Sequence, residues 1–354
     1  MLAVDRLQHL LAQIRTVRIG VLGDFFLDKY LDVDEQLAER SVETGKVAHQ
    51  VIRQVCSAGA AGTVVNNLAA LGVGSIEAIG VIGDDGSGFE LRRALDQVRC
   101  RHEWLLSDPA LMTPTYLKPR NCDVAGLAGE HSRYDSKNRC ALSDDMIARM
   151  RESLEQAGEQ VDAVMVVDQI DSAEGAVMQP AMREVLNVWS QQHPCKTVCI
   201  DSRFHIREFG GNPEWGATVL KPNQYEVLGI RFPEPGQMVD EAGLWRAVEE
   251  LHAQRAAAVI CTLGARGVLV CDAGKSQLIP GVSVSGPIDT TGAGDSFSAA
   301  MVATLAAGGT ATEAATLGIL AASQTIQQLG TTGTASPSDI RRQYTKWLAS
   351  WSKA

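Results

Sequence analysis

The segment 288–301, IDTTGAGDSFSAAM, places two glycines directly before a run of small and apolar residues. The run predicts a buried helix, and Gly292 and Gly294 lie at its N-terminal approach. A helix N-terminus leaves backbone N–H groups unpaired and carries the positive end of the helix dipole. Glycines let a phosphate come close to those N–H groups. The segment therefore predicts an anion-binding turn in front of a buried helix.

Asp295 adds a carboxylate at the start of the same helix. This pairing suits phosphoryl transfer, because the amides hold the charge while the carboxylate accepts the proton of the attacking hydroxyl. A simpler interpretation is that Asp295 only caps the helix, since Asp is a favoured N-cap and Gly-rich turns often precede helices. The four residues GAGD alone favour the cap.

Short apolar runs alternate with helical stretches along the rest of the chain. This alternation predicts a doubly wound, mostly parallel α/β sheet flanked by helices. In such sheets ligands bind outside the carboxyl ends of the strands. Three of the apolar runs are followed by an aspartate at that end: Asp24, Asp168 and Asp201.

The charge balance and cysteine pattern exclude several classes of protein. The 354 residues carry a formal net charge of −10, which argues against nucleic acid or an anionic membrane as a partner. No apolar run approaches the ~18 residues of a transmembrane helix. The N-terminal leucines follow helical spacing among charged residues, unlike a secretory signal. The eight cysteines contain no CxxC pair, so we expect reduced thiols, no cysteine metal site and a cytoplasmic protein.

The string DTTGAGDSF at 289–297 resembles the C-terminal signature of the ribokinase-like (PfkB) carbohydrate kinases. The resemblance runs from Val17 to about Ala335. It implies a single kinase domain over residues 1–354, with ATP and Mg²⁺ as cofactors. It also implies that Asp295 is the catalytic base and that the amides of Gly292, Ala293 and Gly294 form the anion hole.

The N-terminal half resembles the same family at two places. GDFFLDKY at 23–30 is similar to the opening of the heptose-7-phosphate kinase branch, which implies that Asp24 and Asp28 bind sugar hydroxyls; a turn cap explains Asp24 equally well. Residues 59–72 resemble the sugar-binding signature, with Gly59 in place; the family's asparagine falls on Thr63, or on Gly62 if the gap is placed differently. Short strand-like pieces at about 32–56 and 113–136 imply a small β lid, which in the family is often a dimer contact, so we expect a homodimer.

Further motifs follow in the family's order. Asn223 and Glu226 resemble the N-x-x-E motif, which implies that they hold Mg²⁺ through water beside the ATP phosphates. The resemblance implies that Thr262, Gly264 and Gly267 form a nucleotide-phosphate turn, although the same residues are equally a hairpin turn. It also implies a potassium site at Asp289 and Thr291.

The expected activity is that of an ATP-dependent sugar or sugar-phosphate kinase. The branch's D-Y-x-K-G reads Asp168-Gln169-Ile170-Asp171 here, without the lysine. A phosphorylated acceptor would need cations, and the candidates lie in or beside the lid. The alternative is a sugar- or nucleotide-binding regulatory module without turnover; its sign would be loss of the base or the anion hole, and both are intact. The candidate cations are Arg40, Lys46, Lys118, Arg120 and Arg133.

Overall fold

The computed structural model describes residues 2–124, 129–171, 174–210, 217–234, 236–255, 257–330 and 332–351. Its main sheet has the order β13-β12-β11-β10-β9-β8-β1-β4-β5. The strands from β5 to β11 pair in parallel, whereas β12 pairs antiparallel with both β11 and β13. The predicted fold class is therefore confirmed. The strands are β1 Arg18–Gly23, β4 Ser75–Gly83, β5 Leu105–Asp108, β8 Ala163–Asp168, β9 Thr197–Ser202, β10 Ala217–Leu220, β11 Ala258–Thr262, β12 Gly267–Asp272 and β13 Lys275–Pro280.

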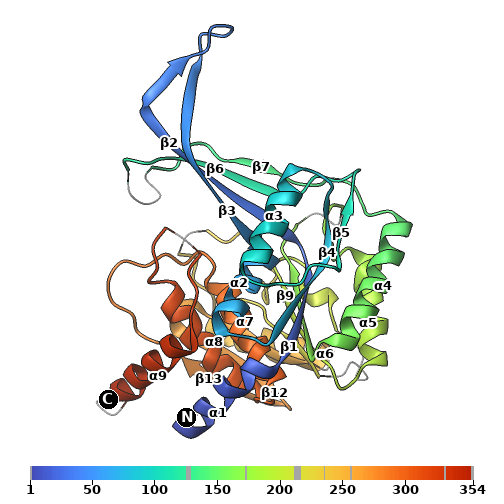
Figure 1. The fold of residues 1–354 in the computed structure, drawn as a ribbon. Coiled ribbons are helices and arrows are strands. Elements are labelled where there is room, and N and C mark those ends of the chain that lie inside the picture. The colour runs from blue at the N-terminus through green and yellow to red at the C-terminus, as the bar shows by residue number, and fades with distance from the viewer. Residues whose placement is uncertain are drawn as a thin grey trace.

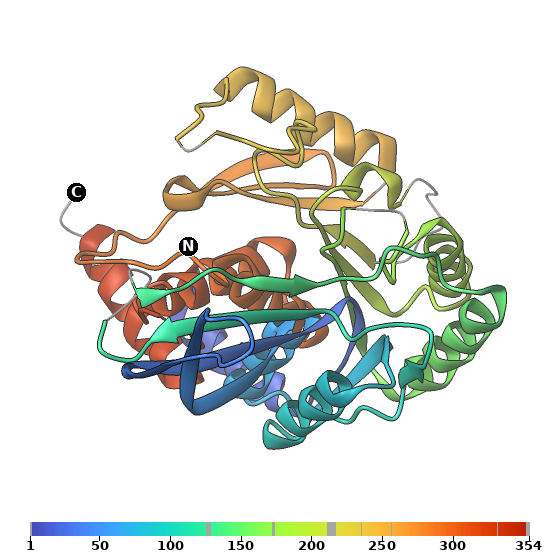
Figure 2. The same cartoon turned by 90° about the horizontal axis from the view of Figure 1, so that it is seen from above.

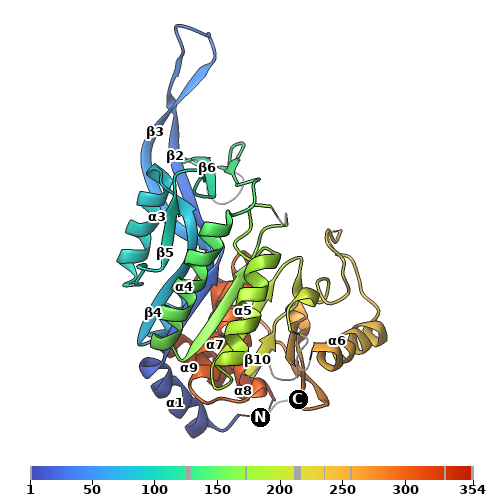
Figure 3. The same ribbon diagram turned by 90° about the vertical axis from the view of Figure 1, so that its right-hand side faces the viewer.

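Helices cover both faces of this sheet because the sheet's side chains alternate between two buried clusters. Figure 3 looks onto the side that carries α4 and α5, with α7 and α8 behind the sheet. In the described part of the chain, no helix is long and apolar enough to cross a membrane. One cluster includes α1 Val4–Gln13, α2 Ala61–Leu71, α3 Gly86–Gln97, α7 Ala293–Ala306, α8 Ala311–Thr325 and α9 Pro337–Trp351; the other includes α4 Asp144–Gln160, α5 Pro180–Gln192 and α6 Glu241–Arg255.

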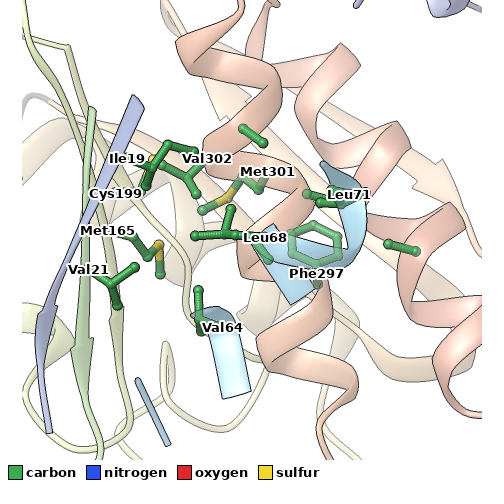
Figure 4. Packing of buried hydrophobic residues seen from close by; sticks show 14 of the residues in the cluster. Ile19, Val21, Val64, Leu68, Leu71, Met165, Cys199, Phe297, Met301 and Val302 are labelled. Atoms are coloured by element: carbon green, nitrogen blue, oxygen red, sulfur yellow. The ribbon is translucent and has the colours of Figure 1, made fainter. Parts of the chain in front are cut away.

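Helix α7 is fixed by apolar packing on two sides. Figure 4 shows Phe297 and Met301 of α7 beside Leu68 of α2, with Val21 and Met165 on the strands of the sheet. All five side chains are at most 3% exposed. Because α7 contacts β8 and β9, its N-terminus is held near the carboxyl ends of the central strands.

A second, four-stranded sheet has the order β3-β2-β6-β7. Its strands are β2 Phe25–Arg40, β3 Val47–Ala60, β6 Thr115–Asn121 and β7 Tyr134–Ser136. Strand β2 begins earlier than the predicted lid segment, and only Asp24 separates it from β1. Strand β6 accompanies β2 from Leu27 to Val33, so the outer parts of β2 and β3 form a two-stranded arm that projects from the body (Figures 1 and 2). That the whole chain acts as one domain stays a prediction.

Candidate active site

Helix α7 begins at Ala293, with Gly292 as its N-cap at φ +76°. No side chain caps this end, and Asp295 lies inside the first turn. The interpretation of Asp295 as a simple cap is therefore wrong. Its carboxylate makes no hydrogen bond or ion pair with any described residue and stays partly exposed, so it is available to a reacting group.

The N–H groups of this turn differ in availability. The amide of Ala293 donates to the carbonyl of Thr290 at 3.2 Å, whereas those of Gly294 and Asp295 have no partner within the described residues. Orphan amides at a helix start are the anion-binding groups. Of the three amides predicted to form the anion hole, only that of Ala293 is engaged by a described residue, and the amide of Asp295 is an additional free donor. Thr63 adjoins the same turn, since a Cβ on Gly292 would lie 3.6 Å from its methyl group.

Lys221 brings a buried positive charge to the turn. Its ammonium lies 3.1 Å from Oδ2 of Asp201, which also accepts a 2.7 Å bond from the hydroxyl of Ser298. A Cβ on Gly294 would lie 4.0 Å from the same ammonium. Burial alone would lower the pKa of Lys221, but Asp201 and Glu226 raise it above its usual value. Lys221 is therefore a permanent cation beside the anion-binding turn.

The carboxylates around Lys221 outnumber their cations. Burial raises the pKa of Asp295 to about 7, with Asp201 and Asp28 adding to the rise and Lys221 opposing it. Burial likewise raises the pKa of Glu226 to about 7; the charge of Asp201 adds to this rise, and the charge of Lys221 opposes it. A pKa near 7 suits a general base at neutral pH. It also marks negative charge that a bound cation would stabilise.

Asn223 and Glu226 form a closed pair at the end of β10. The two oxygens of Glu226 accept the backbone N–H and the side-chain amide of Asn223, both at 2.7 Å. Asn223 also bridges to Thr262 of β11, which joins the two motifs predicted to serve ATP. Among the described residues no group of three or more His, Cys, Asp or Glu could hold a metal directly. The crowded carboxylates fit Mg²⁺ held through water and nucleotide phosphates, as such sites commonly do.

The remaining predicted nucleotide and potassium residues lie in two turns. Gly264 and Gly267 have φ of +60° and +106°, and they join β11 to its antiparallel neighbour β12, so this motif is also a hairpin turn. The carboxylate of Asp289 accepts the N–H groups of Thr291 at 3.0 Å and Gly330 at 3.3 Å. Asp289 thereby ties the entry of α7 to the loop after α8.

The two predicted sugar ligands have different surroundings. Asp24 is 2% exposed and its carboxylate accepts backbone N–H groups of Gln169, Ile170 and Val177 at 2.8–3.3 Å. Its burial raises its pKa to about 7, and Asp168 adds to the rise. These bonds fasten the loop after β8, a structural role different from the local turn cap that the sequence offered as the alternative.

Asp28 instead lies within the lid sheet. Its Oδ1 is 2.7 Å from the ammonium of Lys118, and a Cβ on Gly59 would lie 2.5 Å from its Oδ2. Its charge also raises the pKa of Asp295. Asp28 is therefore the predicted sugar ligand that is electrostatically connected to the predicted base, and Gly59 leaves room at its carboxylate.

A cavity of about 430 Å³ lies between the lid and the entry to α7. Lys118 and Arg120 line it over the ring of Tyr30, at 4.9 and 5.1 Å, and Arg133 lies 4.7 Å above the ring of Tyr116. Arg40, by contrast, bonds to the carbonyl of Gly45 at the tip of the arm. Of the five candidate cations, Lys118, Arg120 and Arg133 line the cavity, and Asp289 and Thr291 line it as well.

Comparison with known proteins finds a family match over part of the chain. Residues 212–339 match the family described as pfkB family carbohydrate kinase. This match confirms the predicted resemblance, and a sugar kinase remains the expected class of enzyme. The bifunctional protein HldE of Nitrobacter winogradskyi is 29% identical over 296 residues, 81% of this chain and 55% of the relative. HldE of Syntrophotalea carbinolica is 26% identical over 317 residues, which are 87% of this chain and 59% of the relative.

The chain thus spans little more than half the length of these curated relatives. Solved structures share its fold. Phosphofructokinase-2 from Escherichia coli in complex with potassium has a TM-score of 0.70 at 20% identity, covering 94% of this chain and 99% of that one. Ribokinase from Cryptococcus neoformans in complex with ADP has a TM-score of 0.64 at 21% identity, covering 92% and 99%. At these identities the likeness establishes the ribokinase-like fold alone.

Proposed function

We propose that this protein transfers the γ-phosphoryl group of ATP to a hydroxyl of a sugar that itself carries a phosphate, in the manner of a heptose-7-phosphate kinase. The observation that carries the proposal is Asp295 in the first turn of α7, free of partners among the described residues and flanked by free amides and Lys221. This group combines a base with donors for the transferred charge. The relatives named HldE support the sugar-phosphate class.

Each residue then has a chemical task. Asp295 removes the proton from the acceptor hydroxyl as its oxygen bonds to the γ-phosphorus and the bond to ADP breaks. Lys221 and the amides of Gly294 and Asp295 hold the oxygens of the transferred group. Glu226 and Asn223 orient water around Mg²⁺, which when bound supplies charge neutralisation between the phosphates. A potassium ion near Asp289 and Thr291 would act on the same turn.

The acceptor occupies the space between Asp28 and the lid cavity. Asp28 binds sugar hydroxyls beside Gly59, and Lys118, Arg120 and Arg133 bind the acceptor's phosphate over aromatic rings. The projecting arm supports the proposed homodimer, because a lone two-stranded ribbon is marginally stable in water. Its exposed apolar residues include Leu37, Val42, Val47, Val51 and Ile52.

ATP consumption with a panel of sugars and sugar phosphates tests this function. We expect turnover with Mg²⁺ that stops in excess chelator, and a preference for phosphorylated sugars. A comparison of sodium and potassium buffers tests the potassium site. If ATP binds but no acceptor is phosphorylated, the regulatory-module alternative replaces the kinase.

A further inference from the structure

The loop after β9 holds the backbone of Arg203 firmly. The hydroxyl of Ser202 donates to the carboxylate of Asp168 at 2.6 Å, and the ring of His205 approaches the same oxygen at 3.0 Å. Between them, the N–H of Arg203 donates to the carbonyl of Asp168 at 3.0 Å. Asp168 is fully buried at the end of β8. The loop is therefore fastened on both sides of Arg203.

The guanidinium of Arg203 has no such attachment. It is exposed, and within the described residues it contacts the ring of Phe204 at 5.6 Å but forms no hydrogen bond or ion pair. Arg231 lies on the same ring at 5.4 Å, yet it is paired with the carboxylate of Asp171. Arg203 thus has a fixed backbone and no anionic partner in the described part of the chain, and it shares the ring of Phe204 with an arginine whose charge is already paired.

Arg203 lies at the meeting point of the site's three parts. Strand β9 lies between β8 and β10, so its loop lies beside the residues that follow β10. Burial raises the pKa values of Asp295, Glu226 and Tyr116, and the charge of Arg203 is among the groups that lower each. These residues belong to α7, to the motif after β10 and to the lid. Asp201, two residues before Arg203, also contacts both Lys221 and Ser298 of α7. The β9 loop therefore starts between these parts of the site, and the guanidinium is within electrostatic reach of them.

The charges of the site leave a task for this cation. Two lysines of the site, the half-buried Lys118 and the buried Lys221, each share their charge with a carboxylate, Asp28 and Asp201 respectively. Asp295 has no ion-pair partner among the described residues, and a nucleotide would add further negative charge. The transferred phosphoryl group spreads that charge over its equatorial oxygens. A planar guanidinium with several donors matches such oxygens better than a single ammonium does.

We propose that Arg203 binds the oxygens of the transferred phosphoryl group and stabilises the transition state together with the amides of α7. The inference rests on the proposed phosphoryl transfer. As the acceptor oxygen bonds to phosphorus and the bond to ADP breaks, the proton goes to Asp295 and Arg203 stays charged throughout. Arg203 is thereby a catalytic residue supplied by the β9 loop.

Three variants of the full chain test this role: Arg203→Gln, Arg203→Lys and, as the matched control, Arg231→Gln. We expect Arg203→Gln to lower kcat on the order of 10²–10³-fold, the usual loss for one donor to a developing anion. The KM values for ATP and for the acceptor should change only a few-fold. Arg203→Lys should recover part of the rate, and Arg231→Gln should resemble the wild type.

A binding measurement gives a second readout that needs no acceptor. With Mg²⁺ present, aluminium fluoride and ADP together mimic the phosphoryl group in flight, and such mimics bind more tightly than ground-state ligands. Arg203→Gln should weaken the affinity for ADP with aluminium fluoride while leaving the affinity for ADP alone unchanged. Retained affinity for ADP also demonstrates that the variant is folded.

The inference is overturned if Arg203→Gln keeps the wild-type kcat, or if only the KM of a phosphorylated acceptor rises. The second result would place the guanidinium on the acceptor's own phosphate. A wild-type protein that binds ATP but phosphorylates no acceptor would instead refute the proposed function, and the inference with it. Normal wild-type turnover together with an unaffected Arg203→Gln variant refutes the inference alone.

Discussion

The two walls of the proposed site, the carboxyl edge of the main sheet and the lid sheet, treat charge in opposite ways. At the carboxyl edge of the main sheet, Asp295 and Glu226 are crowded, and burial raises the pKa of each to about 7. In the lid sheet, Asp28 and Asp32 are paired with Lys118 and Arg120 at 2.7 and 2.6 Å. One wall holds negative charge that lacks enough cations, whereas the other holds preformed ion pairs beside aromatic rings.

This difference assigns different kinetic parameters to the two walls. Uncompensated carboxylates suit a proton acceptor and a metal–nucleotide complex, so changes at the main sheet should alter kcat and its pH dependence. Cations placed on aromatic rings suit an anionic acceptor, so changes in the lid should alter the acceptor KM. A main-sheet variant that altered only the acceptor KM, or a lid variant that altered only kcat, would contradict this difference between the two walls.

The largest expected effect is at the base. Asp295→Asn keeps the size of the side chain but cannot accept the proton, so kcat should fall roughly 10²–10⁴-fold with ATP affinity retained. Steady-state kinetics and a nucleotide-binding assay measure the two quantities. Asp145→Asn, an exposed aspartate in the first turn of α4, is the matched control. Near-normal turnover in Asp295→Asn would remove this residue from its proposed role.

The pH dependence should follow the raised pKa of Asp295. The base works only when deprotonated, so kcat/KM should fall about tenfold per pH unit below its pKa near 7. Asp201→Asn removes a neighbouring negative charge and should move this acid limb to lower pH. A pH–rate profile of both proteins measures the shift. A wild-type limb below pH 5 would contradict the crowded-carboxylate description of the main-sheet wall.

The lid cations should give smaller effects, confined to the acceptor. Hydrogen bonds to charged groups contribute about 1.5–3 kcal/mol, so Lys118→Met or Arg120→Met should raise the KM of a phosphorylated acceptor on the order of 10- to 100-fold. The kcat should change little. Arg40→Met at the arm tip is the control. If neither lid variant weakens the acceptor, the acceptor is neutral and the heptose-7-phosphate hypothesis fails while the sugar kinase remains.

The smallest kinetic effect is expected at Asp24. Asp24→Ala leaves three backbone N–H groups, two of them in buried bonds, without their acceptor, which should lower the free energy of unfolding by about 1–3 kcal/mol or more. The acceptor KM should stay near that of the wild type, whereas Asp28→Ala should raise it. Urea denaturation and acceptor kinetics separate the two variants. If Asp24→Ala raised the acceptor KM without lowering the free energy of unfolding, Asp24 would be a ligand of the acceptor.

The main sheet could be predicted from the sequence because its strands are continuous apolar runs. Strand β8 is buried at every position, and its run stands out in the sequence. Strand β2 was harder to place, since its outer part is exposed and rich in charged residues. Its start at Phe25 is decided by pairing with Ala60 at the end of β3, a contact that no local pattern encodes.

The candidate site shows the same division. The segment around Asp295 could be found because glycines, carboxylate and apolar run are adjacent in the sequence. The role of Lys221 could not, because its partner Asp201 lies on the neighbouring strand β9 and is brought close only by parallel pairing. Asp24 accepts N–H groups from a loop more than a hundred residues later, which strand-end position alone does not distinguish from a ligand site.

Strand β2 runs from the cavity beside the lid to the tip of the arm, but its pairing with β3 is not uniform. The register shifts between Asp32 and Val33 and again between Asp34 and Glu39. Such bulges bend a strand and interrupt its ladder. They divide β2 mechanically into a stiff inner part, braced by β6, and a compliant outer part. Bending at these bulges would therefore change the angle of the arm while leaving Asp28, in the inner part, in place.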